Sequence, residues 1–135
     1  MKIGVIGFGR AGRAVSSVLL ESKKTNLQWV LRRSHILEHR SVPEFLGISS
    51  EEPGLIYSIS EFSAEDLLQR YPVDAIVDFS SEDGILYYGE EAARRGITIV
   101  SAVSQYSDES KALLQRLSES TRVIFSPNIT LGINF

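Results

Sequence analysis

The sequence predicts an α/β fold, a doubly wound and mainly parallel β-sheet with helices on both of its faces. Short apolar runs rich in β-branched residues alternate with stretches of helical periodicity, which is typical of βαβ units around a parallel sheet. Several of these runs are apolar at every position, as strands covered on both sides by helices should be. The chain has 135 residues, which suits a single core, so residues 1–135 are expected to form one domain.

Each apolar run predicts one strand of the sheet. The six expected strands cover residues 3–6, 27–31, 55–59, 75–79, 98–101 and 123–125. The first helix is expected over residues 10–21, between the first two strands. Ala14, Val15, Val18 and Leu19 recur there at helical spacing, which predicts that they form one buried stripe against the sheet.

Capping residues and helix breakers place the next elements. Ser63 and Asp66 resemble a capping box, which predicts a helix that runs through Arg70 and is stopped by Pro72. Residues 34–54 hold two prolines and two glycines and are expected to form a loop with one short helix.

Two more helices are expected in the second half of the chain. Either Ser80 or Ser81 is expected to cap a helix that runs to Arg95, with Gly96 as its C-terminal stop. Ser107 is expected to open the last helix. The inward face of that helix is predicted to hold three leucines, Leu113, Leu114 and Leu117.

The composition argues against several classes of protein. The formal net charge is -3 at pH 7, which argues against a nucleic acid partner because neutralising phosphates requires a clustered basic surface. No apolar run approaches the roughly 18 residues of a membrane helix, so no membrane association is expected. The chain has no cysteine, which excludes disulfides and thiolate zinc sites and is compatible with a cytoplasmic location, the expected one.

A glycine-rich segment, Gly7-Phe8-Gly9-Arg10-Ala11-Gly12, lies between the first predicted strand and the first predicted helix. In that context the GxGxxG pattern predicts a Rossmann-type site that holds a dinucleotide pyrophosphate at the helix N-terminus. Gly7 would permit the tight turn, Gly9 would let the backbone approach the pyrophosphate, and Gly12 would let helix and strand pack closely. The alternative is a Rossmann domain without a ligand, because glycine-rich turns also serve chain reversal alone.

The second predicted strand leads into Arg32 and Arg33, followed by Ser34. An acidic residue at this place would accept hydrogen bonds from the free 2′-hydroxyl of NADH. A guanidinium instead suits a 2′-phosphate, through its charge and its fork geometry. The sequence therefore predicts that NADPH is preferred over NADH. The alternative is that both arginines are solvated loop residues.

Ligands of open α/β sheets bind at the carboxyl ends of the strands, so the loops there supply further candidates. The candidates in these loops are Phe79, Ser80, Ala102, Ser104, Ser126 and Asn128. Their polar groups suit the carboxamide and the riboses of a nicotinamide cofactor, although the same residue types also cap helices.

Three other features are expected to have structural roles. No carboxylate or cysteine cluster joins His35 and His39, so these are predicted to be surface histidines rather than metal ligands. Glu90-Glu91 and Arg94-Arg95 predict i,i+4 ion pairs on a solvated helix face. Asp78 is expected to bond the amides of the following loop rather than to act as a catalytic acid.

Three segments occur in an order that is typical of one enzyme family. They are the glycine turn extended to Arg13, the segment Val77-Asp78-Phe79-Ser80 and the segment Ser126-Pro127-Asn128-Ile129-Thr130-Leu131-Gly132-Ile133-Asn134. Together they resemble the dihydrodipicolinate reductases of bacterial lysine biosynthesis. The resemblance implies hydride transfer from NADH or NADPH to a cyclic, imine-like dicarboxylate. It assigns cofactor binding to the glycine turn, to Arg32 or Arg33, to the Phe79-Ser80 loop and to residues 126–128.

The chain departs from the family pattern in two places. Family members carry a glycine-threonine-threonine-glycine segment beside the nicotinamide, where this chain has Ala102-Val103-Ser104-Gln105. The family's histidine pair, catalytic lysine and substrate clamp belong to a C-terminal domain beyond the point where this sequence stops. The resemblance therefore implies a cofactor domain with no catalytic residue of its own, which takes a small dicarboxylate substrate only together with a second domain.

The chain stops on an apolar segment, residues 130–135, which suggests that further residues once followed or that the end packs on a partner. That partner could be a second copy of the chain, in a homo-oligomer. Two other functions are compatible with the same residues. One is a stand-alone NADP-binding module that senses or regulates without catalysis. The other is a Rossmann domain for a different nucleotide, such as coenzyme A or adenosylmethionine, because one fold hosts many functions.

Overall fold

The computed structural model describes residues 1–34, 36–103 and 106–125. The strands are β1 (Lys2–Ile6), β2 (Asn26–Arg32), β3 (Leu55–Ser58), β4 (Ala75–Asp78), β5 (Thr98–Ser101) and β6 (Val123–Phe125). The helices are α1 (Arg10–Glu21), α2 (Val42–Leu46), α3 (Ala64–Arg70), α4 (Glu82–Arg94) and α5 (Asp108–Leu117). Every predicted strand is confirmed to within one residue at each end, and α2 is the short helix expected in the loop.

All six strands form one sheet in the order β3-β2-β1-β4-β5-β6, and every neighbouring pair is parallel. This order is that of the Rossmann fold, with the reversal of strand order between β1 and β4. The predicted fold class is therefore confirmed. In the described part of the chain, no helix combines the length and the apolar character needed to cross a membrane.

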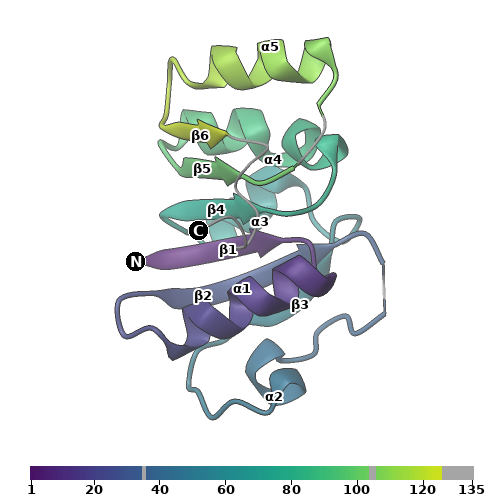
Figure 1. Cartoon of the computed structure of the whole chain (residues 1–135), viewed down its shortest axis with the longest axis vertical. Coiled ribbons are helices and arrows are strands. Elements are labelled where there is room, and N and C mark those ends of the chain that lie inside the picture. The colour runs from purple at the N-terminus through teal and green to yellow at the C-terminus, as the bar shows by residue number, and fades with distance from the viewer. Residues whose placement is uncertain (35, 104–105, 126–135) are drawn as a thin grey trace.

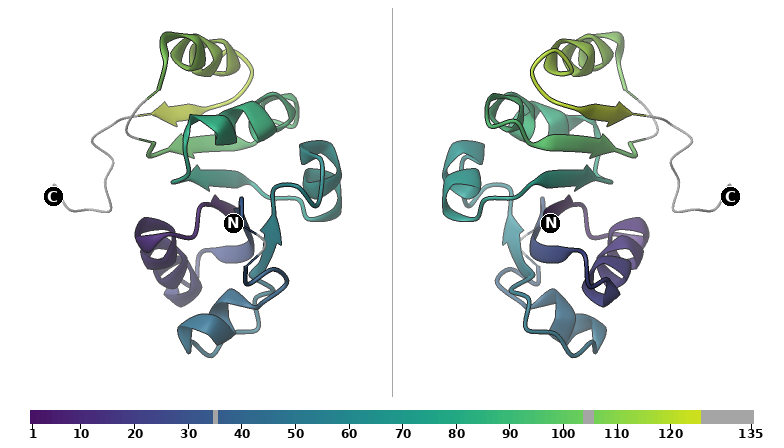
Figure 2. Two further views of the ribbon diagram at one scale, coloured as in Figure 1. Left: turned by 90° about the vertical axis from the view of Figure 1, so that its right-hand side faces the viewer. Right: turned by 90° about the vertical axis from the view of Figure 1, so that its left-hand side faces the viewer.

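Helices cover the sheet on both faces, as Figures 1 and 2 show. α1 lies on one face with α2 beside it, α3 and α4 cover the opposite face, and α5 packs against α4 and β6. The core is divided accordingly into two clusters, one that includes Leu20 and Val42 and one that includes Leu67, Tyr88 and Leu114. The sheet between them is apolar on both sides, which explains the continuous apolar runs of the strands.

The buried face of α1 differs from the predicted stripe. Gly12 and Ser16 are buried against the sheet, whereas Ala14 and Val18 are exposed and the other two predicted residues are half-buried. The physical reason is a close approach of two backbone segments. An ideal Cβ on Gly12 would lie 2.1 Å from the carbonyl oxygen of Gly7. α1 therefore turns Gly12 and Ser16 toward the sheet, and the predicted stripe is wrong at Ala14 and Val18, whereas Leu19 packs in part against the core.

On β1, Gly4 makes room for the side chain of its register partner on β2, Trp29. Trp29 is 1% exposed, and an ideal Cβ on Gly4 would lie 2.4 Å from two atoms of the indole ring. The indole N–H donates to the carbonyl oxygen of Tyr71 at 3.0 Å. Trp29 therefore joins the middle of the sheet to the end of α3.

The predicted caps at Ser63 and Ser107 are confirmed, whereas Ser81 holds the predicted cap position of α4 without a capping bond. The Ser63 hydroxyl accepts a hydrogen bond from the Asp66 amide at 3.1 Å at the start of α3. At the start of α4, Ser81 occupies the cap position but its side chain makes no capping bond. The neighbouring Ser80 hydroxyl donates instead to the Asp78 carboxylate at 2.6 Å. A carboxylate is a stronger acceptor than a hydroxyl, so Asp78 determines how this turn is held.

Candidate functional site

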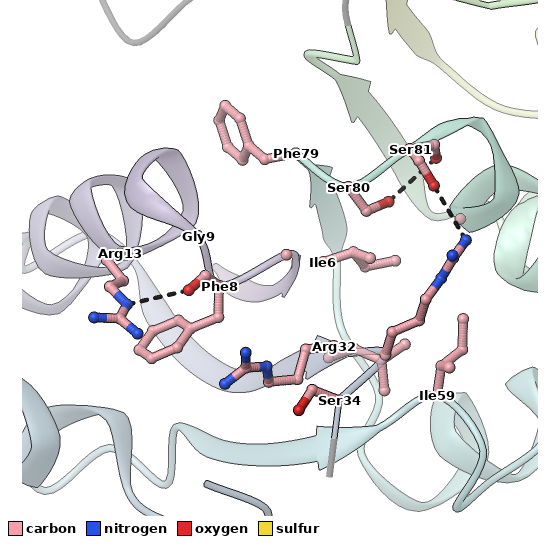
Figure 3. Close-up of a pocket in the computed structure, with 14 residues that line it drawn as sticks. Ile6, Phe8, Gly9, Arg13, Arg32, Ser34, Ile59, Phe79, Ser80 and Ser81 are labelled. Carbon is pink, nitrogen blue, oxygen red and sulfur yellow. Dashed lines mark hydrogen bonds between the residues drawn. The ribbon is translucent and has the colours of Figure 1, made fainter. Parts of the chain in front are cut away.

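A cavity of about 540 Å³ opens at the carboxyl ends of β1, β2 and β4. It lies where the strand order reverses, which is the place at which open α/β sheets bind ligands. The predicted site residues that line it are Gly7, Phe8, Gly9, Arg32, Arg33, Phe79 and Ser80. Figure 3 shows several of them converging from the glycine turn, from β2 and from the loop after β4.

The remaining predicted site residues do not line the cavity or lie outside the described part of the chain. Arg10, Ala11 and Gly12 form the first turn of α1. Ala102 follows β5 and donates its amide hydrogen to the carbonyl oxygen of Asp78 at 2.9 Å. Ser104, Ser126 and Asn128 are outside the described residues.

The three glycines of the turn have different surroundings. Gly7 has a φ of +106°, and its amide donates to the carbonyl oxygen of Leu31 at 2.8 Å. An ideal Cβ there would lie 3.1 Å from the backbone carbon of Phe79. At Gly12 the same atom would collide with Gly7, whereas at Gly9 it would meet no atom within 4 Å. Gly7 and Gly12 are therefore required by the fold, whereas no contact among the residues that the structure describes requires a glycine at Gly9.

The N-terminus of α1 presents a positive end to this region. Gly9 is its N-cap, no side chain caps it, and its first turn contains no acidic residue. The first amides of a helix have no acceptor within the helix, and the helix dipole adds positive character to them. The arrangement suits an anion such as a phosphate group.

Both predicted arginines at the end of β2 line the cavity, but each also bonds a protein group. Arg32 donates to the carbonyl oxygen of Ile36 at 3.2 Å. Arg33 donates to the Ser81 hydroxyl at 3.3 Å and to the carboxylate of Asp83 in the first turn of α4. The Arg33 and Asp83 side chains are 64% and 61% exposed, so the pair is in contact with solvent.

Sequence reasoning did not predict several of the residues that line the cavity, and Arg13 and Gly84 are two of them. Arg13 donates to the carbonyl oxygen of Phe8 at 3.1 Å, and its guanidinium lies 4.9 Å and 5.0 Å from the ring centroids of Phe8 and Phe45. Phe8 itself is buried, with 3% of its surface exposed. An ideal Cβ on Gly84 would lie 2.4 Å from the Ser80 hydroxyl oxygen. A glycine in the first turn of a helix beside a candidate loop was the available signal for this residue.

Asp78 anchors the loop after β4, as predicted. Its carboxylate is fully buried and accepts from the Ser80 amide at 2.8 Å, from the Ser80 hydroxyl and from the Tyr88 hydroxyl at 2.8 Å. Burial raises the pKa of Asp78, although these hydrogen bonds lower it part of the way. Burial, and next the charge of Asp78, raises the pKa of Tyr88 well above its ordinary value.

The raised pKa of Asp78 predicts a pH-dependent contribution to stability. Between its unfolded pKa, about 3.9, and its higher folded pKa, the folded chain binds more protons than the unfolded chain, so the free energy of unfolding falls as pH rises. The Asp78→Asn variant lacks this titration. We expect the stability of Asp78→Asn relative to the natural chain to be higher at pH 7 than at pH 4, measured by urea denaturation. An equal difference at both pH values would contradict the assignment.

Two of the predicted structural roles are corrected outside the cavity. Glu91 pairs with Arg95 at 3.3 Å, as predicted, but Glu90 pairs with Arg116 of α5 rather than with a residue of its own helix. This happens because α5 packs alongside α4. The second correction concerns the two histidines. Of these, His35 is outside the described residues.

His39 is a surface residue, as predicted, but two carboxylates do join it. The ligand atoms of Glu38, His39 and Glu61 all lie within 4.8 Å of one another, and His39 Nε2 is 2.5 Å from Glu61 Oε1. Glu61 follows β3, and the fold brings it back to the loop after β2. The expectation that no carboxylates gather at His39 is therefore wrong, because the parallel pairing of β2 and β3 brings Glu61 to it.

The chain is similar to known proteins over nearly its whole length. The family model described as "Dihydrodipicolinate reductase, N-terminus" matches residues 1–129. A 4-hydroxy-tetrahydrodipicolinate reductase of Paraburkholderia phymatum is 28% identical over 138 residues, which cover 99% of this chain and 48% of that protein. This chain therefore spans about half the length of that relative.

Solved structures share the fold. RSP, a Rex-family repressor solved in complex with β-NADH, has a TM-score of 0.63 at 15% identity and matches 91% of this chain and 51% of that chain. A hyperthermophilic archaeal homoserine dehydrogenase in complex with NADPH has a TM-score of 0.56 at 22% identity. The match covers 92% of this chain and 43% of that chain. These likenesses concern the fold alone. The match of the family model over residues 1–129 is what identifies the chain: it belongs to the dihydrodipicolinate reductase family and corresponds to the N-terminal part of its members.

Proposed function

We propose that this chain binds a nicotinamide dinucleotide, as the cofactor domain of a dihydrodipicolinate reductase-type oxidoreductase. The observation that carries the proposal is the contrast among the three glycines of the turn. Gly7 and Gly12 are held by close backbone contacts, whereas no atom of the described residues other than the chain neighbours fills the space within 4 Å beside Gly9, and Gly9 lines the cavity. A glycine with no packing reason at this position fits the close approach of a pyrophosphate.

The charges around the cavity fit the same group. The amides at the start of α1 suit the pyrophosphate, and Arg32 and Arg33 suit a phosphate on the adenine ribose. Among the described residues that line the cavity there is no carboxylate to accept hydrogen bonds from a free 2′-hydroxyl. We therefore propose a preference for NADPH over NADH. When bound, the nicotinamide supplies a hydride, and this chain's residues bind and orient the dinucleotide.

Calorimetric titration with both cofactors tests this proposal. A charge-assisted hydrogen bond contributes about 1.5 to 3 kcal/mol, so we expect NADPH to bind roughly tenfold or more tightly than NADH. Equal affinities, or tighter binding of NADH, would contradict the preference and leave dinucleotide binding intact. Binding of neither cofactor would contradict the proposed function itself.

We further propose that residues 1–135 act as one cofactor domain and that substrate reduction requires groups outside it. The described residues that line the cavity include no aspartate, glutamate, histidine, lysine or tyrosine that could transfer a proton. The 135-residue chain is therefore expected not to oxidise NADPH in the presence of 4-hydroxy-tetrahydrodipicolinate. The measurement follows the absorbance of the reduced nicotinamide, which is lost on oxidation. Normal turnover by this chain alone would show that the domain carries its own catalytic groups.

A further inference from the structure

The ion pair between Arg33 and Asp83 joins two sides of the cavity. Arg33 follows β2, Asp83 lies in the first turn of α4, and the two residues are separated by 50 positions in the sequence. Arg33 also donates to the Ser81 hydroxyl, and Arg33 and Ser81 both line the cavity. The hydrogen bond that ends on Ser81 is drawn in Figure 3. The guanidinium suited to a 2′-phosphate is therefore already bonded to an acidic side chain.

The other arginines of the cavity are held differently. Arg32 donates to a backbone carbonyl, and Arg13 donates to another and lies over two aromatic rings. Within the described part of the chain, Arg33 is thus the cavity-lining arginine that forms an ion pair with a carboxylate. A phosphate that bonds Arg33 has to displace Asp83 or share the guanidinium with it. In the second case, two negative groups are brought close together, which is unfavourable.

We propose that Asp83 is a specificity-determining residue, which competes with the 2′-phosphate of the cofactor for Arg33. This inference rests on the proposed dinucleotide function and refines it. Asp83 lowers the affinity for a 2′-phosphorylated nucleotide and leaves the affinity for its unphosphorylated counterpart unchanged, because only the former needs Arg33 to leave its partner. Asp83 therefore reduces the margin by which NADPH is preferred over NADH.

The test uses 2′,5′-ADP and 5′-AMP, which differ only in the 2′-phosphate. Their affinities are measured by calorimetry at one low salt concentration for the natural chain and for Asp83→Asn. Exposed ion pairs contribute up to about 1 kcal/mol, so Asp83→Asn is expected to bind 2′,5′-ADP about two- to fivefold more tightly. Its affinity for 5′-AMP is expected to stay the same.

Two further variants make the test specific. Glu90→Gln removes one negative charge from the same helix, where Glu90 forms a comparably exposed pair with Arg116, and it should change neither affinity. Asp83→Glu keeps the carboxylate and should keep the natural ratio of affinities. Both variants also control for the folding of α4, which thermal melting of each protein verifies.

Each outcome has a defined meaning. Unchanged binding of 2′,5′-ADP by Asp83→Asn, or an equal gain for both nucleotides, overturns the role of Asp83. If the natural chain still prefers 2′,5′-ADP in that experiment, the proposed function stands. If the natural chain binds neither nucleotide, the proposed function fails and the role of Asp83 fails with it.

Discussion

Replacement of Gly12 with alanine is expected to lower the free energy of unfolding by about 3 kcal/mol, the upper range for overpacking a tight contact, and to abolish dinucleotide binding. The added methyl group would lie 2.1 Å and 2.7 Å from the carbonyl oxygen and carbon of Gly7. Both are backbone atoms, so no side-chain rotation relieves the collision. α1 has to move away from β1, and the amides at its N-terminus move with it. Urea denaturation and NADPH calorimetry measure the two effects.

Gly9→Ala is the matched control for that variant, because it adds the same methyl group three residues earlier, at the N-cap of α1. Apart from the chain neighbours, no atom of the described residues lies within 4 Å of the added carbon, and the backbone at Gly9, with φ of -78° and ψ of -160°, is accessible to alanine. We expect a stability loss of about 1 kcal/mol or less, from the weaker helix cap, together with a clear loss of NADPH affinity. Unchanged affinity in Gly9→Ala would contradict the assignment of this space to the pyrophosphate.

The second large effect is expected at the end of β2. Arg33→Ala should weaken NADPH binding by roughly ten- to a hundredfold, because a charge-assisted hydrogen bond to a phosphate is lost. The affinity for NADH should change little, since NADH has no 2′-phosphate. Arg32→Ala, measured in the same way, shows whether the neighbouring guanidinium shares this role.

The control for the arginine variants is Arg116→Ala, which removes an exposed arginine from a comparable ion pair on α5. It should leave the ratio of NADPH to NADH affinity unchanged. A loss of NADPH affinity in this variant would mean that overall charge, rather than a contact at the end of β2, governs the preference. If neither Arg33→Ala nor Arg32→Ala lowers NADPH affinity, the 2′-phosphate is not bound by these residues.

Local sequence patterns were sufficient for the elements of the fold and for much of the cavity. Strands buried on both faces leave continuous apolar runs in the sequence. Val5, Val30 and Ile76 lie in three such runs, one in each of three strands, and all three residues are fully buried. The glycine turn was recognisable because a strand precedes it and a helix follows it. These signals depend on residues close together in the chain, and a single sequence contains that information directly.

The features that the sequence did not predict depend on contacts between distant segments. The partner of Arg33 lies 50 residues away and becomes its neighbour only through the strand order between β2 and β4. The buried face of α1 depends on a backbone approach at Gly12, which apolar periodicity does not reveal. His39 and Glu61 meet for the same topological reason. Periodicity describes which residues face inward along one element, but it does not describe which elements face each other.

The position of Trp29 provides an optical probe for the variants described above. It is the chain's single tryptophan, it is enclosed between β1 and the end of α3, and it is not among the residues that line the cavity. Its fluorescence should therefore shift to longer wavelength when the sheet comes apart and water reaches the indole. Emission spectra can thus report loss of structure in Gly12→Ala separately from loss of nucleotide affinity in Gly9→Ala, with no added dye or label.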